Sequence, residues 1–184
     1  SYTIFSTWDT YRAWNSLMTW IKPEYIEAWT RSLLQTEYLP IWEIWRTDSQ
    51  MMTGTHSISM VGEYALKGLI PVEMVWDKID KTLFRSDRYY DEYYSLGYIP
   101  KENSRVATSM ALEHAYTDFV LESLMNQFDL KLRRQPNPKS YVNVFSDDMF
   151  YSRRRDGHFD KAFHTKVNHG FEEGSALTYQ WSVV

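Results

Sequence analysis

Hydrophobic positions recur at helical spacing along most of the first two thirds of this chain. One set follows Ser6 and Thr7, either of which can cap a helix, and a second follows Pro23, which suits the first turn of a helix. The residues in the two sets are Tyr11, Trp14, Met18 and Ile21, then Ile26, Trp29 and Leu33. Residues three and four apart share one face of a helix, so each set predicts a helix with one buried side.

Further helices are predicted from the same periodicity. They lie at about 55–67, 71–83, 89–94 and 105–128. Gly68 follows the first of these, and Gly97 and Pro100 follow the third, as expected for residues that end helices.

Prolines mark the interruptions of the helical pattern. Pro40 precedes an aromatic segment at 42–45, which we expect to be a short connection. Pro136 and Pro138 prevent the longest helix from continuing, and another helix is expected at 138–145.

The helical signal weakens after residue 146. Between 146 and 174 the apolar residues come singly and Asp156-Gly157 reads as a turn, so a long loop and a short hairpin both stay open. Any sheet should be confined to this region, and 175–184 should form a last helix or its first turns. The pattern therefore predicts an all-α fold of antiparallel helical pairs. Such pairs suit an α/α toroid, and they suit other helical arrays too.

The composition supports a packed core and excludes several classes of protein. Of 184 residues, 43% are hydrophobic and 17% aromatic, with eight Trp and fourteen Tyr. Bulky helix packing explains these aromatic residues, and so would a sugar site, because aromatic faces stack on pyranose rings. The net charge of −4 comes with no basic stripe, so nucleic acid is not an expected partner. No apolar run is long enough to span a membrane, so a membrane partner is not expected either.

The absence of cysteine removes disulfides, thiolate zinc sites and cysteine nucleophiles. No signal peptide is recognisable, and the chain closes on an apolar run without a stop signal. We therefore expect the chain to be a segment of something longer.

Six segments carry motifs in a fixed order along nearly the whole chain. They are residues 2–12 (YTIFSTWDTYR), 39–43 (LPIWE), 54–57 (GTHS) followed by 65–68 (ALKG), 96–100 (LGYIP), 112–118 (LEHAYTD) and 173–181 (EGSALTYQW). In sequence, order and spacing this series resembles the catalytic domain of glycoside hydrolase family 92, the calcium-dependent exo-α-mannosidases.

The resemblance implies an inverting enzyme that removes terminal α-mannosides from glycans. Its helical domain would be an (α/α)6 toroid, and residues 1–184 would be one fragment of that domain. The remainder of the parent domain would be its partner, and the family's N-terminal β-sandwich would lie outside this chain. The resemblance also implies a bound calcium ion and favours a secreted or periplasmic location.

Inverting glycosidases need a protonated carboxyl group as acid and an ionised one as base. Glu43 lies between Trp42 and Ile44, and apolar surroundings keep a carboxyl group protonated. A buried hydrogen-bond partner is the alternative role for it, and the resemblance favours the acid because Glu43 matches the family's Leu-Pro-x-Trp-Glu. Asp147 and Asp148 are candidates for the base, since the family has Asp-Pro-Asp near this point. A solvated turn is the alternative for this pair.

The resemblance suggests Glu113 as a calcium ligand or an orienting residue, and Glu173 as a weaker second ligand. Calcium prefers hard oxygen ligands, which carboxylates supply. The alternative for Glu113 is an ion pair with an arginine.

Trp8, Asp9, Trp42 and His56 are the candidate sugar-binding residues. Asp9 has the spacing for a surface pair with Arg12, and His56 has the alternative of a structural histidine.

Several residues depart from the family's pattern. Ser175, Leu177 and Thr178 stand where the family motif has Asn, Trp and Gln. These changes leave open a second interpretation, a catalytically silent carbohydrate-binding or structural helical domain.

Overall fold

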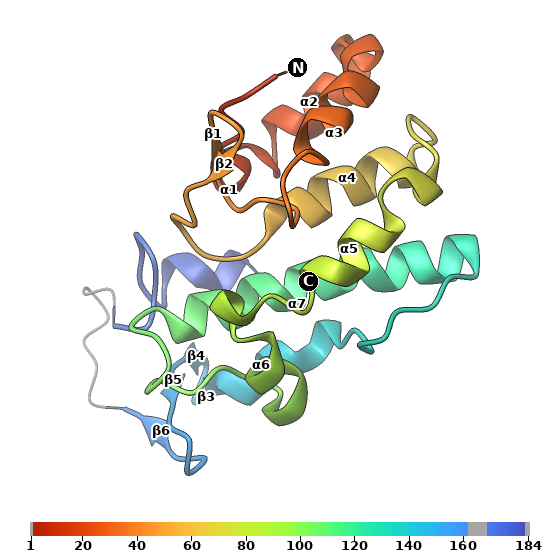
Figure 1. The fold of residues 1–184 in the computed structure, drawn as a ribbon. Helices are drawn as coiled ribbons and strands as arrows, with labels where there is room; N and C mark the ends of the chain where they lie inside the picture. Colours follow the sequence, from red (N-terminus) through yellow and green to blue (C-terminus); the bar gives the residue numbers. More distant parts are fainter. Residues whose placement is uncertain (1, 162–168, 183–184) are drawn as a thin grey trace. The chain divides into compact units, whose positions relative to one another are not determined.

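The computed structural model describes residues 2–161 and 169–182 (Figure 1). Contacts divide the chain into two compact units, one of Ser1–Phe84 and Val120–Arg134 and one of Arg85–Phe119 and Gln135–Val184. Helices dominate both units, and the strands of the described residues are two residues long. The prediction of a helix-dominated fold is confirmed.

The first unit holds most of the helices, which Figure 1 labels. They are α1 (Thr7–Thr10), α2 (Trp14–Ile21), η1 (Pro23–Tyr25), α3 (Ile26–Leu33), α4 (His56–Leu66), η2 (Val72–Met74), α5 (Trp76–Thr82) and the C-terminal part of α7 (Ala107–Phe128). Its almost fully buried apolar side chains include Ile26, Leu33, Leu39, Ile41, Ile58, Val61, Val75, Ile79, Leu83, Leu121 and Leu124.

Two helices of this unit approach each other closely at a glycine. A Cβ atom built on Gly62 of α4 would lie 2.6 Å from Cγ1 of Val120 and 3.2 Å from Cδ1 of Leu124 on α7. The missing side chain thus allows this contact.

Helix α4 ends as the sequence predicts. Gly68 has φ +69°, its N–H donates to the Ala65 carbonyl, and the Leu69 N–H donates to the Tyr64 carbonyl. These two hydrogen bonds form the Schellman ending of a helix, which favours glycine.

The first predicted helix is wrong in its length and its buried face. The chain leaves helical geometry at Ala13, so α1 and α2 are separate helices. The interruption rotates the second half, and Trp14 and Ile21 are 47% and 57% exposed. The buried residues of α2 are instead Asn15 and Thr19.

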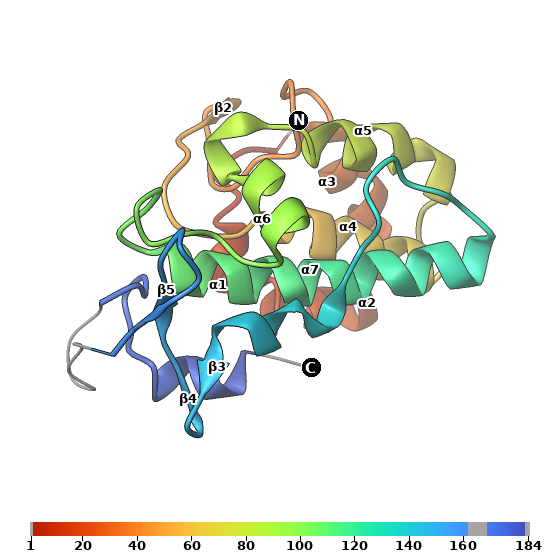
Figure 2. The ribbon, with the colours of Figure 1, turned by 90° about the horizontal axis from the view of Figure 1, so that it is seen from below.

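The second unit combines the start of α7 with shorter elements. They are η3 (Ser86–Arg88), α6 (Tyr90–Leu96), η4 (Pro138–Val144), β3 (Phe145–Ser146), β4 (Met149–Phe150), β5 (Ser152–Arg153), β6 (Phe159–Asp160) and η5 (Thr178–Trp181). Figure 2 shows β4 beside η5. One core cluster of this unit contains Tyr98, Leu112, Val144, Phe150, Phe171, Ala176 and Tyr179.

Of the two alternatives for 146–174, the structure has hairpins. Strand β3 pairs with β4 and β5 with β6, both antiparallel. The helices expected at 138–145 and after 175 are 3-10 helices rather than α-helices.

The expectation that sheet is confined to 146–174 is wrong. Strands β1 (Glu43–Ile44) and β2 (Thr47–Asp48) form a hairpin in the segment expected to be a plain connection. Trp45 and Arg46 make its two-residue turn with φ values of 53° and 67°. Such a turn favours Asn and Gly, so this sequence carried no hairpin signal.

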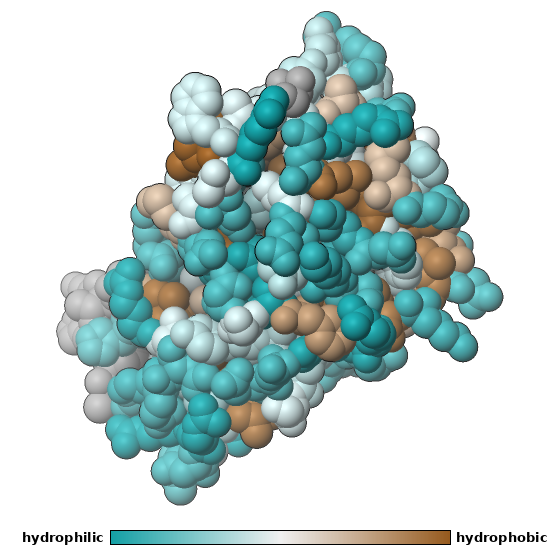
Figure 3. All heavy atoms as spheres, in the orientation of Figure 1, coloured by the Kyte–Doolittle hydropathy of each residue, from teal (hydrophilic) through white to brown (hydrophobic). Residues whose placement is uncertain are grey.

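On the face drawn in Figure 3, hydrophilic residues predominate and the hydrophobic ones form small separate groups. Among the residues that the structure describes, Trp20 and Trp181 are the most exposed large apolar side chains, at 79% and 86%. Within the described part of the chain, no helix combines the length and the apolar character that crossing a membrane requires.

Candidate active site

Glu43 is a buried carboxyl group held by several donors. It is 2% exposed, and its side chain accepts hydrogen bonds from Thr3 Oγ1 at 2.7 Å, from the Ile4 backbone N–H at 2.7 Å and from the Arg46 backbone N–H. Its own backbone pairs with Phe5 through N–H···O bonds of 3.0 and 3.1 Å. The N-terminal segment therefore runs beside β1 and encloses the carboxyl group.

The turn of the β1–β2 hairpin explains one of these donors. Left-handed backbone at Trp45 and Arg46 is costly for residues with a side chain, about 1–2 kcal/mol each. The same geometry directs the Arg46 N–H at the Glu43 carboxyl group, and this charge-assisted hydrogen bond offsets part of that strain. Strained backbone is often found at functional sites, which makes this hairpin a candidate site.

The surroundings of Glu43 differ from the expected apolar ones. Trp42 and Ile44 are half-buried, and the Trp45 side chain is 74% exposed. Polar donors face the carboxyl group instead, and donors of this kind stabilise a carboxylate. This geometry fits the alternative role of a buried hydrogen-bond partner, and the acid role stays a prediction.

A residue that the sequence analysis missed, Asp48, shapes the loop before Glu43. Its Oδ1 accepts the backbone N–H groups of Ile41 and Trp42, each at 3.2 Å, and that of Gln50 at 3.1 Å. Aspartate often bonds nearby backbone N–H groups in turns, but the bonds back to 41 and 42 depend on the hairpin.

Asp147 and Asp148 form the two-residue turn of the β3–β4 hairpin. Their φ values are 49° and 60°, and both side chains are exposed. Asp147 accepts a hydrogen bond from the Lys161 ammonium, which together with the lysine charge lowers the pKa of Asp147. These aspartates belong to the second unit and Glu43 to the first. Their geometry is that of a solvated turn, and the base role stays a prediction.

The four candidate sugar-binding residues lie in the first unit. Trp8 and Trp42 are half-buried, Asp9 is exposed, and His56 is 1% exposed. The His56 ring stacks on Tyr11 with 3.7 Å between centroids and 7° between planes. This packing fits a structural histidine, and its sugar-binding role is untested.

The tip of α1 is tied to the segment that precedes Glu43. Thr7 is buried, and its Oγ1 donates to the Ile41 carbonyl at 2.7 Å. The first two motifs, at 2–12 and 39–43, therefore meet in the structure.

The two candidate calcium ligands lie in different environments. Glu113 is 4% exposed, and its Oε1 accepts a hydrogen bond from the Tyr179 hydroxyl at 3.3 Å. Glu173 is exposed, with φ 44°. Within 2–161 and 169–182, no three Asp, Glu, His or Cys side chains gather as a metal site. The roles of Glu113 and Glu173 as calcium ligands stay predictions.

Another buried carboxyl group, Asp118, holds the second unit together. It accepts hydrogen bonds from the hydroxyls of Tyr93 and Tyr94, at 3.0 and 2.7 Å, and from the Asn137 N–H at 2.8 Å. Burial, and then the charge of Asp118, raises the pKa of both tyrosines. They stay neutral donors at physiological pH, which suits a structural network.

A family model described as the glycosyl hydrolase family 92 catalytic domain matches residues 1–184. Among curated proteins, none matches this chain.

The solved structures with a similar fold include three mannosidase structures. An α-mannosidase of family GH92 from Bacteroides thetaiotaomicron is 23% identical with a TM-score of 0.88, covering 99% of this chain and 26% of that one. Its complex with mannoimidazole gives 21% identity and a TM-score of 0.86, with 99% and 27% covered. A family GH92 inverting mannosidase from Bacteroides thetaiotaomicron VPI-5482 is 20% identical, with a TM-score of 0.75. That match covers 97% of this chain and 27% of the mannosidase chain. This chain thus spans about a quarter of the length of these structures.

Proposed function

We propose that this chain, which belongs to glycosyl hydrolase family 92, is part of the catalytic domain of an enzyme that hydrolyses terminal α-mannosides with inversion. The family match over all of residues 1–184 is the observation that carries this proposal. It is supported by the fold that the chain shares with mannosidases, one of which was solved with mannoimidazole.

In the proposed reaction, Glu43 donates its proton to the oxygen of the departing group. Asp147 or Asp148 accepts a proton from the water that attacks the opposite face of the sugar, and the product has inverted configuration. Calcium is the cofactor that the family resemblance implies, with Glu113 and Glu173 as candidate ligands; in the described part of the chain they do not belong to a group of three Asp, Glu, His or Cys side chains. The proposed steps therefore use only the protein's carboxyl groups.

We also propose that the helices form part of an (α/α)6 toroid within a longer secreted or periplasmic enzyme. The fold similarity over a quarter of the mannosidase chains supports a partial catalytic domain. The remainder of the parent catalytic domain would then be its partner.

One observation favours a second candidate, a catalytically silent carbohydrate-binding or structural domain. Both oxygens of Glu43 accept hydrogen bonds, and two of the three donors are backbone N–H groups. A carboxylate held in this way can serve the fold alone.

Turnover of an aryl α-mannoside by the longest natural form of the protein separates the two candidates. An active enzyme releases mannose that is initially the β-anomer, which NMR detects, whereas a silent domain releases none. Asp147→Asn and Asp148→Asn should each be compared with Asp156→Asn, a third exposed aspartate in a turn. The base is identified by the variant that loses turnover while the Asp156 control keeps it. Equal rates in all three variants would remove both aspartates from the mechanism.

A further inference from the structure

The segment 39–43, which ends on the proposed acid, is buried although most of it is neither helix nor strand. Leu39, Pro40 and Ile41 are buried, and regular structure begins only where Glu43 enters β1. Irregular segments usually run over the surface, where water can satisfy their backbone groups. A buried segment must find its hydrogen-bond partners within the protein, and these partners then fix its conformation.

The carbonyl groups before Glu43 are held by side-chain hydroxyls from two helices. Ser57 Oγ donates to the Pro40 carbonyl at 2.6 Å, and Thr7 Oγ1 donates to the Ile41 carbonyl at 2.7 Å. Both hydroxyl residues are fully buried, Thr7 at the start of α1 and Ser57 near the start of α4. Two separate helices therefore hold the backbone that leads to Glu43.

The amide groups before Glu43 are held by one carboxylate. Oδ1 of Asp48 accepts the N–H groups of Ile41 and Trp42, each at 3.2 Å. Ser49 completes the set, since its N–H and its Oγ donate to the Trp42 carbonyl at 3.0 and 2.8 Å. Asp48 is also the direct cross-strand partner of Glu43 in the β1–β2 hairpin. It therefore connects the backbone before Glu43 to the strand opposite it.

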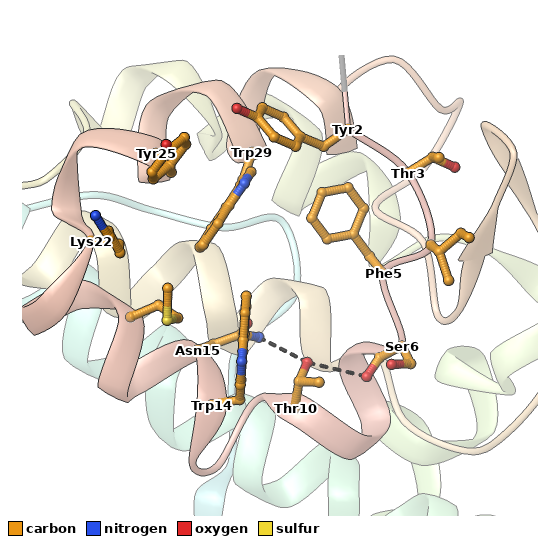
Figure 4. A pocket seen from close by; sticks show the side chains of 12 residues that line it. Tyr2, Thr3, Phe5, Ser6, Thr10, Trp14, Asn15, Lys22, Tyr25 and Trp29 are labelled. Carbon is orange, nitrogen blue, oxygen red and sulfur yellow. Dashed lines mark hydrogen bonds between the residues drawn. The ribbon is translucent and has the colours of Figure 1, made fainter.

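The donors that face the Glu43 carboxyl group itself are less enclosed. Two of them belong to the N-terminal segment 2–6, which lines a cavity of about 620 Å³ together with Trp14 and Trp29 (Figure 4). Because this segment borders a cavity, packing behind it is incomplete. The orientation of Glu43 therefore depends on the buried contacts of 39–43.

We propose that Asp48, Thr7 and Ser57 are positioning residues for the proposed acid. By holding 39–43 in one conformation, they present the Glu43 carboxyl group in one orientation toward the leaving oxygen. A catalytic group has to be held within about 0.5 Å and 10–20° of its productive geometry. The three residues act through Glu43 and not on the substrate, so their role rests on the proposed function.

Steady-state rates on two mannosides test this proposal in the longest natural form of the protein. Thr7→Val should lower kcat on a mannoside with a poor leaving group about tenfold, and Asp48→Ala up to about 10²-fold, the cost of misplacing a catalytic group by about 1 Å. KM should change little, because the weakened interaction is made in the transition state. An activated aryl mannoside needs less protonation and should lose less in both variants.

Thr30→Val is the matched control for Thr7→Val. Thr30 is equally buried, and its Oγ1 also donates to one backbone carbonyl, that of Ile26 at 2.9 Å, but within α3. Both variants should lower the urea midpoint by similar amounts, and only Thr7→Val should lower kcat. Thr7→Ser keeps the donor hydroxyl and Asp48→Asn keeps an acceptor oxygen, so both should retain most of the rate.

Equal kcat in Thr7→Val and Thr30→Val would overturn the proposal, and so would equal losses on both substrates in Asp48→Ala. If Asp48→Ala does not fold, the comparison of Thr7→Val with Thr30→Val decides alone. The proposed function fails in a different way, through a wild-type protein that releases no mannose. That result contradicts the enzyme and any positioning role with it, whereas an active wild type with the first result contradicts only the positioning role.

Discussion

Replacing Glu43 by glutamine tests whether its carboxyl group serves the fold, the chemistry or both. Glu43 Oε1 accepts from Thr3 Oγ1 and the Arg46 N–H, and Oε2 accepts from the Ile4 N–H. Glutamine offers one carbonyl oxygen and one NH2 group. With the oxygen in the Oε1 position, the NH2 group faces the Ile4 N–H, and the reverse placement sets it against the Arg46 N–H.

The expected cost follows from this geometry. One backbone donor loses its acceptor in a site that is 2% exposed, which costs about 1–3 kcal/mol. The other hydrogen bonds keep an acceptor and change little. We therefore expect Glu43→Gln to lower the free energy of unfolding by about 1–3 kcal/mol, the cost of that one unsatisfied donor.

Urea denaturation measures this loss, and two variants calibrate it. Thr3→Val removes one donor and leaves the carboxylate its backbone partners, so it should cost about 1 kcal/mol. Glu37→Gln changes a carboxylate that is 71% exposed and should leave the midpoint within error. An unchanged midpoint in Glu43→Gln would refute the assignment of the three hydrogen bonds.

Rates on two substrates separate the catalytic role. If Glu43 is the acid, turnover of a mannoside with a poor leaving group should fall by about 10²–10⁴. An activated aryl mannoside needs less protonation and should lose less. Equal losses on both substrates would assign Glu43 to the structure alone.

Three further predictions concern the scaffold. Gly62→Ala should lower the unfolding free energy by about 1–3 kcal/mol, because its Cβ would lie 2.6 Å from Val120 Cγ1, and a rise or no change in calorimetry would contradict the packing. Trp45→Gly should raise it by about 1 kcal/mol, since glycine adopts φ 53° without strain; a lower urea midpoint would argue against strain there. Burial alone would raise the pKa of Asp87, but the hydrogen bonds and charge of Arg85 lower it. A lowered pKa stabilises the fold above the ordinary carboxyl pKa and ceases to do so as pH falls through the lowered value. Asp87→Asn should therefore destabilise the protein at pH 7 and progressively less below about pH 4, and a constant difference would refute the pairing.

The spacing of apolar residues along the chain was enough to predict several helices and the face of each that is buried. Ile26, Trp29 and Leu33 on α3 are buried as predicted, and α7 covers the predicted long helix. Spacing of three and four residues places side chains on one face whatever lies beyond it. Gly68 and Gly97 ended their helices as predicted, because left-handed backbone is a property of the residue itself.

Where the chain interrupts a helix, the same reasoning fails. Trp14 and Ile21 continue the apolar spacing of Tyr11, but the break at Ala13 turns the later residues outward. No strong breaker marks this point, so the interruption depends on contacts made elsewhere. The exposed Trp14 then lines a cavity together with residues 2–6 and Trp29, a feature that no spacing rule describes.

For the candidate site, the sequence determined which carboxyl group to examine and the tertiary structure decided what surrounds it. The motif at 39–43 singles out Glu43. Its donors come from Thr3 and Ile4, some forty positions earlier, and from a turn at Arg46 whose residues do not favour a hairpin. Successive side chains along a strand point to opposite faces. The two apolar neighbours of a strand residue therefore lie on the face opposite to its own side chain and need not surround it. Hydrogen bonds across the fold, rather than composition nearby, therefore decide the environment of this carboxyl group.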